Sequence, residues 1–160
     1  MAKKKMPMTP ALRALKGAGV EYRPREYKYV EHGGTKAASQ AVGLDEHAVI
    51  KTLVMEDETG SALIVLMHGD REVSTKNLAR ELGVKSVKPC DPKKVTRLTG
   101  YQVGGTSPLG TRTGLPVYVE ETVLDLERIA VNGGKRGLLV EMSPRDLARL
   151  VKADRVNVGI

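Results

Sequence analysis

The sequence predicts an α/β (α+β) fold in which a curled, mixed β-sheet carries helices on its outside. Three observations favour this class. Segments with one apolar face begin at Ser, Thr or Asp and stop at Gly, which is typical of capped helices. Segments dense in branched residues lie between them and predict strands. Polar turns join some of these strands directly, so we expect hairpins within the sheet.

Five helices are expected, and their first residues are the best defined. Three of them carry Pro at the first helical position, where a backbone N–H is not needed. The expected helices begin at Thr9-Pro10, Thr35, Ser74 or Thr75, Asp91-Pro92 and Ser143-Pro144. Glycines end the first four, and the last places Leu147, Leu150 and Val151 on its apolar face.

Seven strands are expected between and after the helices, at residues 21–30, 48–55, 62–67, 116–119, 128–131, 138–142 and 156–158. The second and third are joined by a polar turn, which predicts a hairpin. Asn132-Gly133-Gly134 predicts a sharp reversal between the fifth and sixth.

The length of 160 residues suits one domain, which we place at residues 8–160 behind a flexible, basic tail of residues 1–7. No apolar run approaches the roughly 18 residues of a membrane span, and the first residues lack the apolar stretch of a signal peptide. The single cysteine, Cys90, excludes an internal disulfide and fits a reducing cytoplasm, where we expect the protein. Cys90 is more simply a buried small residue than a nucleophile, because no partner histidine is evident.

Lys and Arg number 26 against 19 Asp and Glu, a formal net charge of +7. Such a surplus favours a polyanionic partner, because phosphates attract these side chains and release counterions. The chain has no Phe or Trp and only five Tyr, which argues against the aromatic platforms of single-strand binders. For a nucleic-acid partner we therefore expect recognition of backbone and chain end rather than of base sequence.

Lys51 stands in an apolar stretch, residues 49–54, where most side chains should be buried. Burying an unpaired ammonium is costly. The Lys51 ammonium must therefore pair with an anionic group, reach solvent by extending its aliphatic chain, or face a cavity. Two interpretations stay open. Lys51 lies on the wet face of an alternating strand, or it lines a cavity where it holds a phosphate or polarises an acyl group.

Two glycine-rich segments, residues 100–110 and 132–137, offer backbone N–H groups that suit an anion or a developing oxyanion. The first matches neither the phosphate-loop nor the dinucleotide-binding spacing, so an ordinary long turn explains it as well. The second sets Lys135 and Arg136 beside flexible glycines, which suits phosphate binding and equally the solvated tip of a hairpin.

The histidines His32, His47 and His68 form no helical i, i+4 pair, and no Cys/His cluster in the sequence indicates a metal site. We therefore expect neither a metal nor a cofactor. His68 is expected in a turn. His32 follows Tyr29 closely enough to line one cavity with Lys51, or else to remain on the surface.

Taken together, these segments resemble the YbaK family, the aminoacyl-tRNA editing domains that also occur as an insertion in bacterial prolyl-tRNA synthetases. The resemblance runs from about residue 8 to residue 158, and the order and spacing of the motifs make it specific. The matching features are Met8-Thr9-Pro10-Ala11, Tyr29, His32, Val49-Ile50-Lys51-Thr52-Leu53, residues 100–110 and Gly133-Gly134-Lys135-Arg136-Gly137.

The resemblance implies a curled, partly barrel-like mixed sheet and a pocket for the terminal adenosine of tRNA and its amino acid. It implies release of a wrong amino acid, most often from tRNA for proline, by hydrolysis or by cyclisation. The implied partners are aminoacyl-tRNA, through its acceptor end, and optionally prolyl-tRNA synthetase. No membrane, metal or cofactor is expected.

By the same resemblance, Lys51 matches the family's essential lysine. The loop from Gly104 to Pro108 matches one whose backbone holds the ester carbonyl. The other implied site residues are Gly105, Thr106 and Ser107 in the catalytic loop, and Tyr29, His32, Thr52, Gly134, Lys135 and Arg136 in substrate binding. Cysteine is the expected amino acid, and departures from the usual family residues at Thr106, Asn132 and Leu139 leave that specificity open.

The mechanism that follows needs no catalytic triad, because an aminoacyl ester is already activated. Ser107 has no identifiable base. We expect backbone N–H groups of Gly105 to Ser107 to stabilise the oxyanion and Lys51 to anchor the terminal phosphate or ribose. The attacking group then comes from the substrate, as a cysteine thiol or as water activated by the vicinal ribose hydroxyl. Three alternatives stay open: editing of another amino acid such as alanine, a non-catalytic tRNA- or synthetase-binding module, and an enzyme of a small phosphorylated metabolite.

Overall fold

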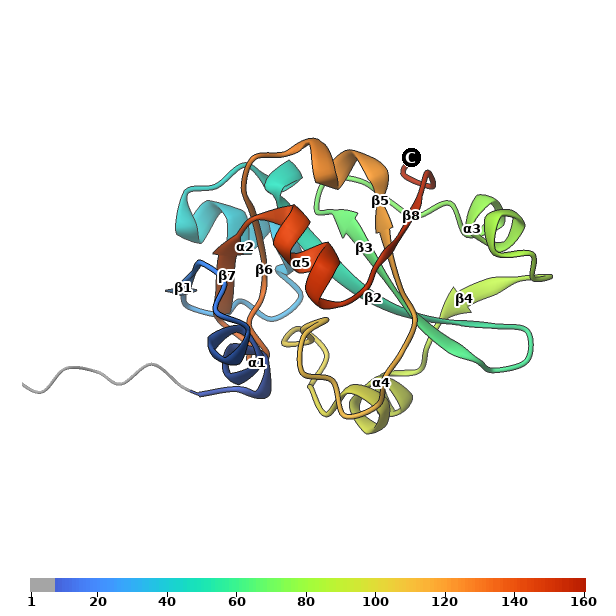
Figure 1. Ribbon diagram of the computed structural model, residues 1–160, viewed down its shortest axis with the longest axis horizontal. Helices are drawn as coiled ribbons and strands as arrows, with labels where there is room; N and C mark the ends of the chain where they lie inside the picture. The colour runs from blue at the N-terminus through green and yellow to red at the C-terminus, as the bar shows by residue number, and fades with distance from the viewer. Residues whose placement is uncertain (1–7) are drawn as a thin grey trace, which may run out of the picture.

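Figure 1 shows the computed structural model of the chain, which describes residues 8–160. The tail expected at residues 1–7 lies outside the described residues. The described residues form five α-helices, α1 (Pro10–Ala18), α2 (Gly34–Val42), α3 (Thr75–Leu82), α4 (Pro92–Thr99) and α5 (Pro144–Leu150), and two 3-10 helices, η1 (Glu46–Ala48) and η2 (Glu121–Asp125). Their eight strands are β1 (Tyr22–Glu26), β2 (Val49–Asp57), β3 (Ala62–His68), β4 (Val87–Pro89), β5 (Val117–Glu120), β6 (Ile129–Asn132), β7 (Leu138–Met142) and β8 (Asp154–Val156).

The five expected α-helices are confirmed. Four of them begin after a side chain that accepts a hydrogen bond from a backbone N–H of the first turn, namely Thr9, Ser74, Asp91 and Ser143. Helix α2 differs, because Gly33 precedes it and supplies no side-chain cap. Capping thus fixes where most of the helices begin, and these positions are readable from the sequence.

The strands form one mixed sheet in the order β1-β7-β6-β2-β3-β5-β8, with β4 paired to β2 beside this path. The pairs β2–β6, β3–β5 and β5–β8 are parallel, and the other pairs are antiparallel. The hairpin expected of β2 and β3 is confirmed. The predicted α/β class with a mixed sheet and outer helices is therefore confirmed, and within residues 8–160 the sheet stays open, since its edge strands β1 and β8 do not pair with each other.

Three strands differ from the sequence prediction. Strand β1 ends at Glu26, opposite Leu138, the first residue of its partner β7. Beyond this point no strand residue lies opposite the chain. Strand β4 was not expected, because Lys88 and Pro89 give this short edge segment no strand signal. Strand β8 ends before Val158, because the last residues turn to pair with residues 72–74.

Helices cover both faces of the sheet. The largest apolar cluster joins α1, α4 and α5 to one face, through Leu15, Val95 and Leu147 among others. On the other face α3 buries Leu78 and α2 buries Ala38 in two further clusters. Figure 1 shows α5 in front of the sheet, with α1 and α3 toward opposite ends of the view. Among residues 8–160, no helix combines the length and apolar character that crossing a membrane requires.

Strand β2 lies at a fork in the sheet. On one side it pairs with β3 along nearly its whole length. On its other side it pairs with β6 only at Val49 and Ile50, and with β4 only from Met55 onward. Between these two ladders, residues 51–53 have no strand partner on that side within the described chain. The fork therefore leaves a short length of peptide edge open in the middle of the sheet.

Candidate active site

A cavity of about 580 Å³ opens beside the fork in β2. Strand β2 and helix α2 contribute to its wall together with the start of α4 and three loops that are distant in sequence. Of the residues predicted for the site, the cavity lining includes Tyr29, His32, Lys51, Thr52, Gly104, Thr106 and Arg136. The lining does not include Gly105, Ser107, Pro108, Gly134 and Lys135, which lie in the same loops.

Lys51 lies in the wall of this cavity. Its side chain is 20% exposed, so the ammonium is only partly hydrated. Its Nζ lies 3.6 Å from Oε1 of Glu72, whose side chain is 82% exposed. Water screens a pair of this length and exposure, so it contributes little free energy. The ammonium is therefore free to exchange Glu72 for an anionic or carbonyl ligand.

Thr52 offers the cavity both a hydroxyl and peptide groups. Its Oγ1 is buried and has no hydrogen-bond partner among residues 8–160. Leaving such a group unpaired costs about 1–3 kcal/mol, so a ligand that pairs with it binds more tightly. The Val54 carbonyl accepts a hydrogen bond from the N–H of Cys90 at 3.0 Å. Along an antiparallel strand, the N–H and C=O groups of every second residue point to the same edge. Those of Thr52 therefore point to the same side as those of Val54, which is the edge that has no partner strand at residues 51–53.

The loop at residues 101–110 is held by its own side chains. The Tyr101 hydroxyl donates to the Leu109 carbonyl at 2.6 Å, and the Thr106 hydroxyl donates to the Gln102 carbonyl at 3.1 Å. The Ser107 Oγ accepts from the Leu109 N–H at 3.1 Å and is fully buried. The Ser107 hydroxyl therefore serves the loop internally, which agrees with the lack of a base for it in the sequence.

The backbone N–H groups of this loop differ in availability. The Gly105 N–H donates to the Gln102 carbonyl at 2.9 Å, so it is already used. The N–H groups of Thr106 and Ser107 have no acceptor within residues 8–160. The set of three expected oxyanion donors is thus reduced to these two. Gly105 packs instead on the turn at residues 132–137, where an added Cβ would lie 2.7 Å from the backbone nitrogen of Arg136.

Asn132 joins the two glycine-rich segments. Its Nδ2 donates to the Gly104 carbonyl at 3.2 Å. Its Oδ1 accepts from the N–H of Gly134 at 2.7 Å and from that of Lys135 at 3.2 Å. This turn of the β6–β7 hairpin therefore packs against the loop beside the cavity through Asn132, while Lys135 and Arg136 remain exposed at its tip, so both interpretations of residues 132–137 stay open.

Tyr29 and Arg136 stand at the mouth of the cavity. The Arg136 Nε donates to the Val103 carbonyl at 3.0 Å, and its guanidinium lies 5.2 Å from the centre of the Tyr29 ring. The Tyr29 hydroxyl approaches Gly104 so closely that a Cβ there would lie 2.6 Å from it. His32 lines the same cavity, yet its side chain is 93% exposed, so it belongs to the rim.

Several lining residues were not among the predicted site residues. Ala38 on α2 and Leu139 on β7 narrow the cavity, and Cys90 lies where β4 leads into α4. Burial raises the pKa of the Cys90 thiol, and Glu56 raises it further, while Lys94 lowers it. The thiol therefore stays protonated near neutral pH, which agrees with Cys90 as a buried small residue. The three-dimensional convergence of these elements places all three residues in the cavity lining.

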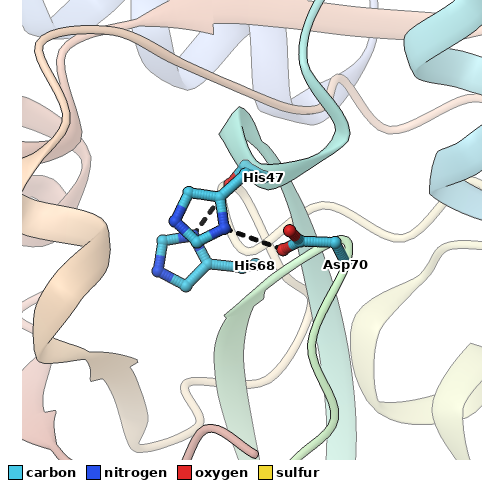
Figure 2. Close-up of side chains that lie close together, drawn as sticks. All are labelled: His47, His68 and Asp70. Carbon is cyan, nitrogen blue, oxygen red and sulfur yellow. Dashed lines mark hydrogen bonds and ion pairs between the residues drawn. The ribbon is translucent and has the colours of Figure 1, made fainter.

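A second polar cluster lies apart from the cavity lining, and the sequence did not predict it. Figure 2 shows His47, His68 and Asp70 close together. The two imidazole rings stack with centroids 3.7 Å apart and planes within 6° of each other. The expectation of His68 in a turn is wrong, because it ends β3 and is fully buried. The hairpin and the short helix η1 bring these distant residues together.

The cluster is a hydrogen-bonded network. The Nδ1 of His68 donates to the His47 carbonyl at 2.8 Å, so its Nε2, 2.7 Å from Oγ1 of Thr122, accepts from that hydroxyl. The Nδ1 of His47 lies 2.8 Å from Asp70 Oδ1. A metal ion binds in the plane of each imidazole at about 2.0–2.1 Å, and two parallel stacked planes cannot both contain one ion. The geometry therefore favours a structural network over a metal site.

Burial and hydrogen bonding set the protonation of this cluster. Burial lowers the pKa of His68 despite its hydrogen bond to the His47 carbonyl, so its neutral form is favoured. Burial acts to raise the pKa of Asp70, but the hydrogen bond and charge of His47 outweigh it and lower that pKa. The folded cluster thus prefers a neutral His68 beside an ionised Asp70.

Comparison with known proteins agrees with the motifs and the fold. Residues 32–150 match the model of the aminoacyl-tRNA editing domain family. The chain is 31% identical over 152 residues to EbsC of Enterococcus faecalis, provisionally named a Cys-tRNA(Pro)/Cys-tRNA(Cys) deacylase, and the match covers 94% of this chain and 93% of that protein. It is 32% identical over 97 residues to the proline–tRNA ligase of Moorella thermoacetica, which covers 60% of this chain and 17% of the ligase.

A solved structure gives the same result at the level of the fold. It is described, provisionally, as a trans-editing enzyme for prolyl-tRNA synthetase. Its TM-score with this chain is 0.81 at 27% sequence identity, and the match covers 96% of this chain and 99% of that structure. The family match spans most of the sequence, and the whole fold agrees with it. The chain therefore belongs to the aminoacyl-tRNA editing domain family, the YbaK family of trans-editing deacylases.

Proposed function

We propose that the protein removes cysteine from mischarged tRNA(Pro), acting in trans on the ester at the acceptor end. The observation that carries this proposal is that Lys51, Thr52 and Thr106, with its free backbone N–H, line one cavity, and that the free N–H of Ser107 is next in the same loop. All four offer hydrogen-bond donors to an ester and its neighbouring phosphate or ribose. The relative provisionally named a deacylase of cysteinyl-tRNA supports the choice of amino acid.

The proposed roles follow from position and charge. Lys51 anchors the terminal phosphate or a ribose oxygen of the substrate, in exchange for its weak pair with Glu72. The N–H groups of Thr106 and Ser107 stabilise the negative charge that develops on the carbonyl oxygen. Tyr29 and Arg136 hold the terminal nucleoside at the mouth, and His32 contributes from the rim. Gly104, Gly105, Pro108, Gly134 and Lys135 shape the two loops that carry these groups.

The nucleophile in this proposal belongs to the substrate. The thiolate of the esterified cysteine attacks its own carbonyl carbon, the C–O bond to the ribose breaks, and the ribose oxygen takes up a proton. The released thiolactone then reacts with water to give cysteine. This route agrees with a Ser107 hydroxyl tied inside its loop and a Cys90 thiol that stays protonated. Water activated by the vicinal ribose hydroxyl is the alternative route.

A substrate panel tests the proposal. Cysteinyl-, seryl-, alanyl- and prolyl-tRNA(Pro) are incubated with the protein, with and without prolyl-tRNA synthetase, and the loss of ester is measured. We expect rapid loss from the cysteinyl ester alone, because serine supplies oxygen in place of sulfur and alanine supplies no nucleophile. Equal cleavage of the alanyl ester would move the specificity to small amino acids and favour water. Inertness toward all four esters would overturn the deacylase assignment for this chain.

A further inference from the structure

A shallow groove adjoins the cavity at its mouth. It is bounded by the first turn and a half of α4 on one side and by the loop at residues 101–110 on the other. Its lining consists of Pro92, Lys93, Thr96, Gln102, Val103 and Arg136. Three of these residues, Pro92, Val103 and Arg136, also line the cavity. Cavity and groove therefore adjoin along these three residues.

The groove is basic, and the two cations of α4 beside it, Lys93 and Arg97, are unengaged. Lys93 is exposed and lines the groove, and the exposed Arg97, just beyond the lining, follows one turn later on the same helical face. Neither side chain has an ion-pair or hydrogen-bond partner among residues 8–160. Lys94 shows the contrast, since its ammonium donates to Glu56 at 2.9 Å and to the Gly60 carbonyl at 2.7 Å. The positive charge of this groove is thus not neutralised by the protein itself.

Arg136 occupies the junction of cavity and groove. Its Nε donates to the Val103 carbonyl, which fixes the guanidinium over the Tyr29 ring. The hydrogen-bond donors on its terminal nitrogens have no acceptor within the described residues. No carboxylate and no aromatic ring lines the groove. A lining of this kind suits a chain of phosphates and offers no platform for stacking bases.

We propose that this groove binds the phosphodiester backbone of the unpaired nucleotides that precede the terminal adenosine of tRNA. The inference rests on the proposed function, which places that adenosine in the cavity. Arg136 contacts the phosphate nearest the cavity, and Lys93 and Arg97 contact the next ones along α4. Recognition is by charge and spacing, so the base sequence of these nucleotides has little effect.

The chain contains a matched pair of residues that serves as a control for Lys93 and Arg97. Lys76 and Arg80 on α3 have the same identity and the same four-residue spacing as Lys93 and Arg97, and they too are exposed. Neither lies in the lining of the cavity or the groove. The double variant Lys93→Ala/Arg97→Ala is therefore compared with Lys76→Ala/Arg80→Ala, which removes the same charge from a helix outside the cavity and the groove.

The experiment measures deacylation of a series of cysteinyl esters of increasing length. The series runs from cysteinyl-adenosine, through a 3′-terminal tetranucleotide, to full tRNA(Pro). For the parent and the α3 variant we expect kcat/KM to rise with length and to fall with salt. For the α4 variant we expect unchanged kcat/KM on cysteinyl-adenosine and at least about tenfold lower kcat/KM on the longer substrates. Its salt slope should be shallower by about 1.4, for two lost contacts at about 0.7 each on a single strand.

A binding measurement tests the inference independently of catalytic turnover. Fluorescence anisotropy measures the affinity of each variant for a labelled single-stranded RNA ending in CCA, over a range of salt concentrations. If the α4 variant binds and cleaves the long substrates as well as the α3 variant does, the groove assignment is wrong. If no variant cleaves any ester, the proposed function fails, and the anisotropy data still show whether the α4 pair binds the RNA backbone.

Discussion

At the scale of single residues, the site depends on groups whose partners are weak or missing. The Lys51 ammonium has only a long contact to an exposed Glu72, and the Thr52 hydroxyl has no partner among the described residues. Most buried polar groups in proteins are paired, so such exceptions mark where a ligand is accommodated. The sequence singled out Lys51 because a lysine in an apolar strand is unusual. It gave no indication that the Thr52 hydroxyl would be left unpaired, since this depends on neighbours from other elements.

Replacing Lys51 tests this residue directly. Lys51→Ala is expected to lower kcat for the cysteinyl ester by at least about 10²-fold, because the substrate loses a charged donor in a partly dehydrated cavity. The thermal midpoint should change little, since the Lys51–Glu72 pair contributes little stability. Lys16→Ala, on the exposed side of α1, serves as the control and should keep full activity. Parental activity in Lys51→Ala would remove this lysine from the mechanism.

The stacked histidines give a prediction for stability against pH. The pKa of His68 is lowered in the fold by burial, so the unfolded chain binds a proton at higher pH than the folded one. The stabilisation is therefore complete above the unfolded value of about 6.5 and is lost as pH falls below it. The thermal midpoint should be nearly flat from pH 8 to pH 7 and should decrease toward pH 5. In His68→Gln this decrease should be shallower, and an unchanged slope would contradict the assignment to His68.

At the scale of elements, the site is built by loops that pack on one another. Residues 101–110 and 132–137 are separated by two strands in sequence, yet Asn132 bridges them by hydrogen bonds in both directions. Helix bounds were predictable because caps are local signals. The pairing of these loops was not, because it depends on the parallel alignment of β6 with β2, which no local pattern specifies. The family resemblance supplied what the local signals lacked.

Gly105→Ala tests whether this loop packing is required. The new Cβ would lie 2.7 Å from the Arg136 nitrogen and 2.9 Å from the Lys135 carbonyl carbon, both backbone atoms that cannot swing aside. We expect a loss of about 1–3 kcal/mol in unfolding free energy by urea titration, together with reduced deacylation, because Thr106 is displaced. Gly114→Ala is the matched control, since its added Cβ would meet nothing within 4 Å. Equal stability of the two variants would show that the loops separate easily.

At the scale of the whole molecule, the last residues pair with the segment between β3 and α3 that carries Glu72. The Glu120 carboxylate is 1% exposed and accepts hydrogen bonds from the N–H groups of Val158 at 2.7 Å and Gly159 at 3.1 Å. Ile160 pairs with the backbone of Glu72 in both directions. The sequence predicted a terminal strand nearby but placed it two residues late. It could not show that a buried carboxylate at the end of β5 fixes this segment.

Deleting residues 158–160 should therefore destabilise the protein strongly. The deletion removes both backbone donors of the Glu120 side chain, at a cost of about 1–3 kcal/mol, and with them the burial of Val158. We expect a large decrease in the urea midpoint of the shortened chain. In a Glu120→Gln background the same deletion should cost less, because no charge is then left unpaired. Equal costs in the two backgrounds would show that the segment acts through other contacts.

The open edge of β2 has a consequence for how such a protein changes over time. Part of what residues 51–53 present to the cavity is peptide backbone, which every amino acid carries and no point mutation deletes. The side chains around that edge, such as Leu139 and Thr106, are free to vary. A substitution there changes the shape of the cavity and leaves the main-chain edge in place. If the proposed function holds, the choice of amino acid can therefore change in evolution while the backbone groups at the cavity persist.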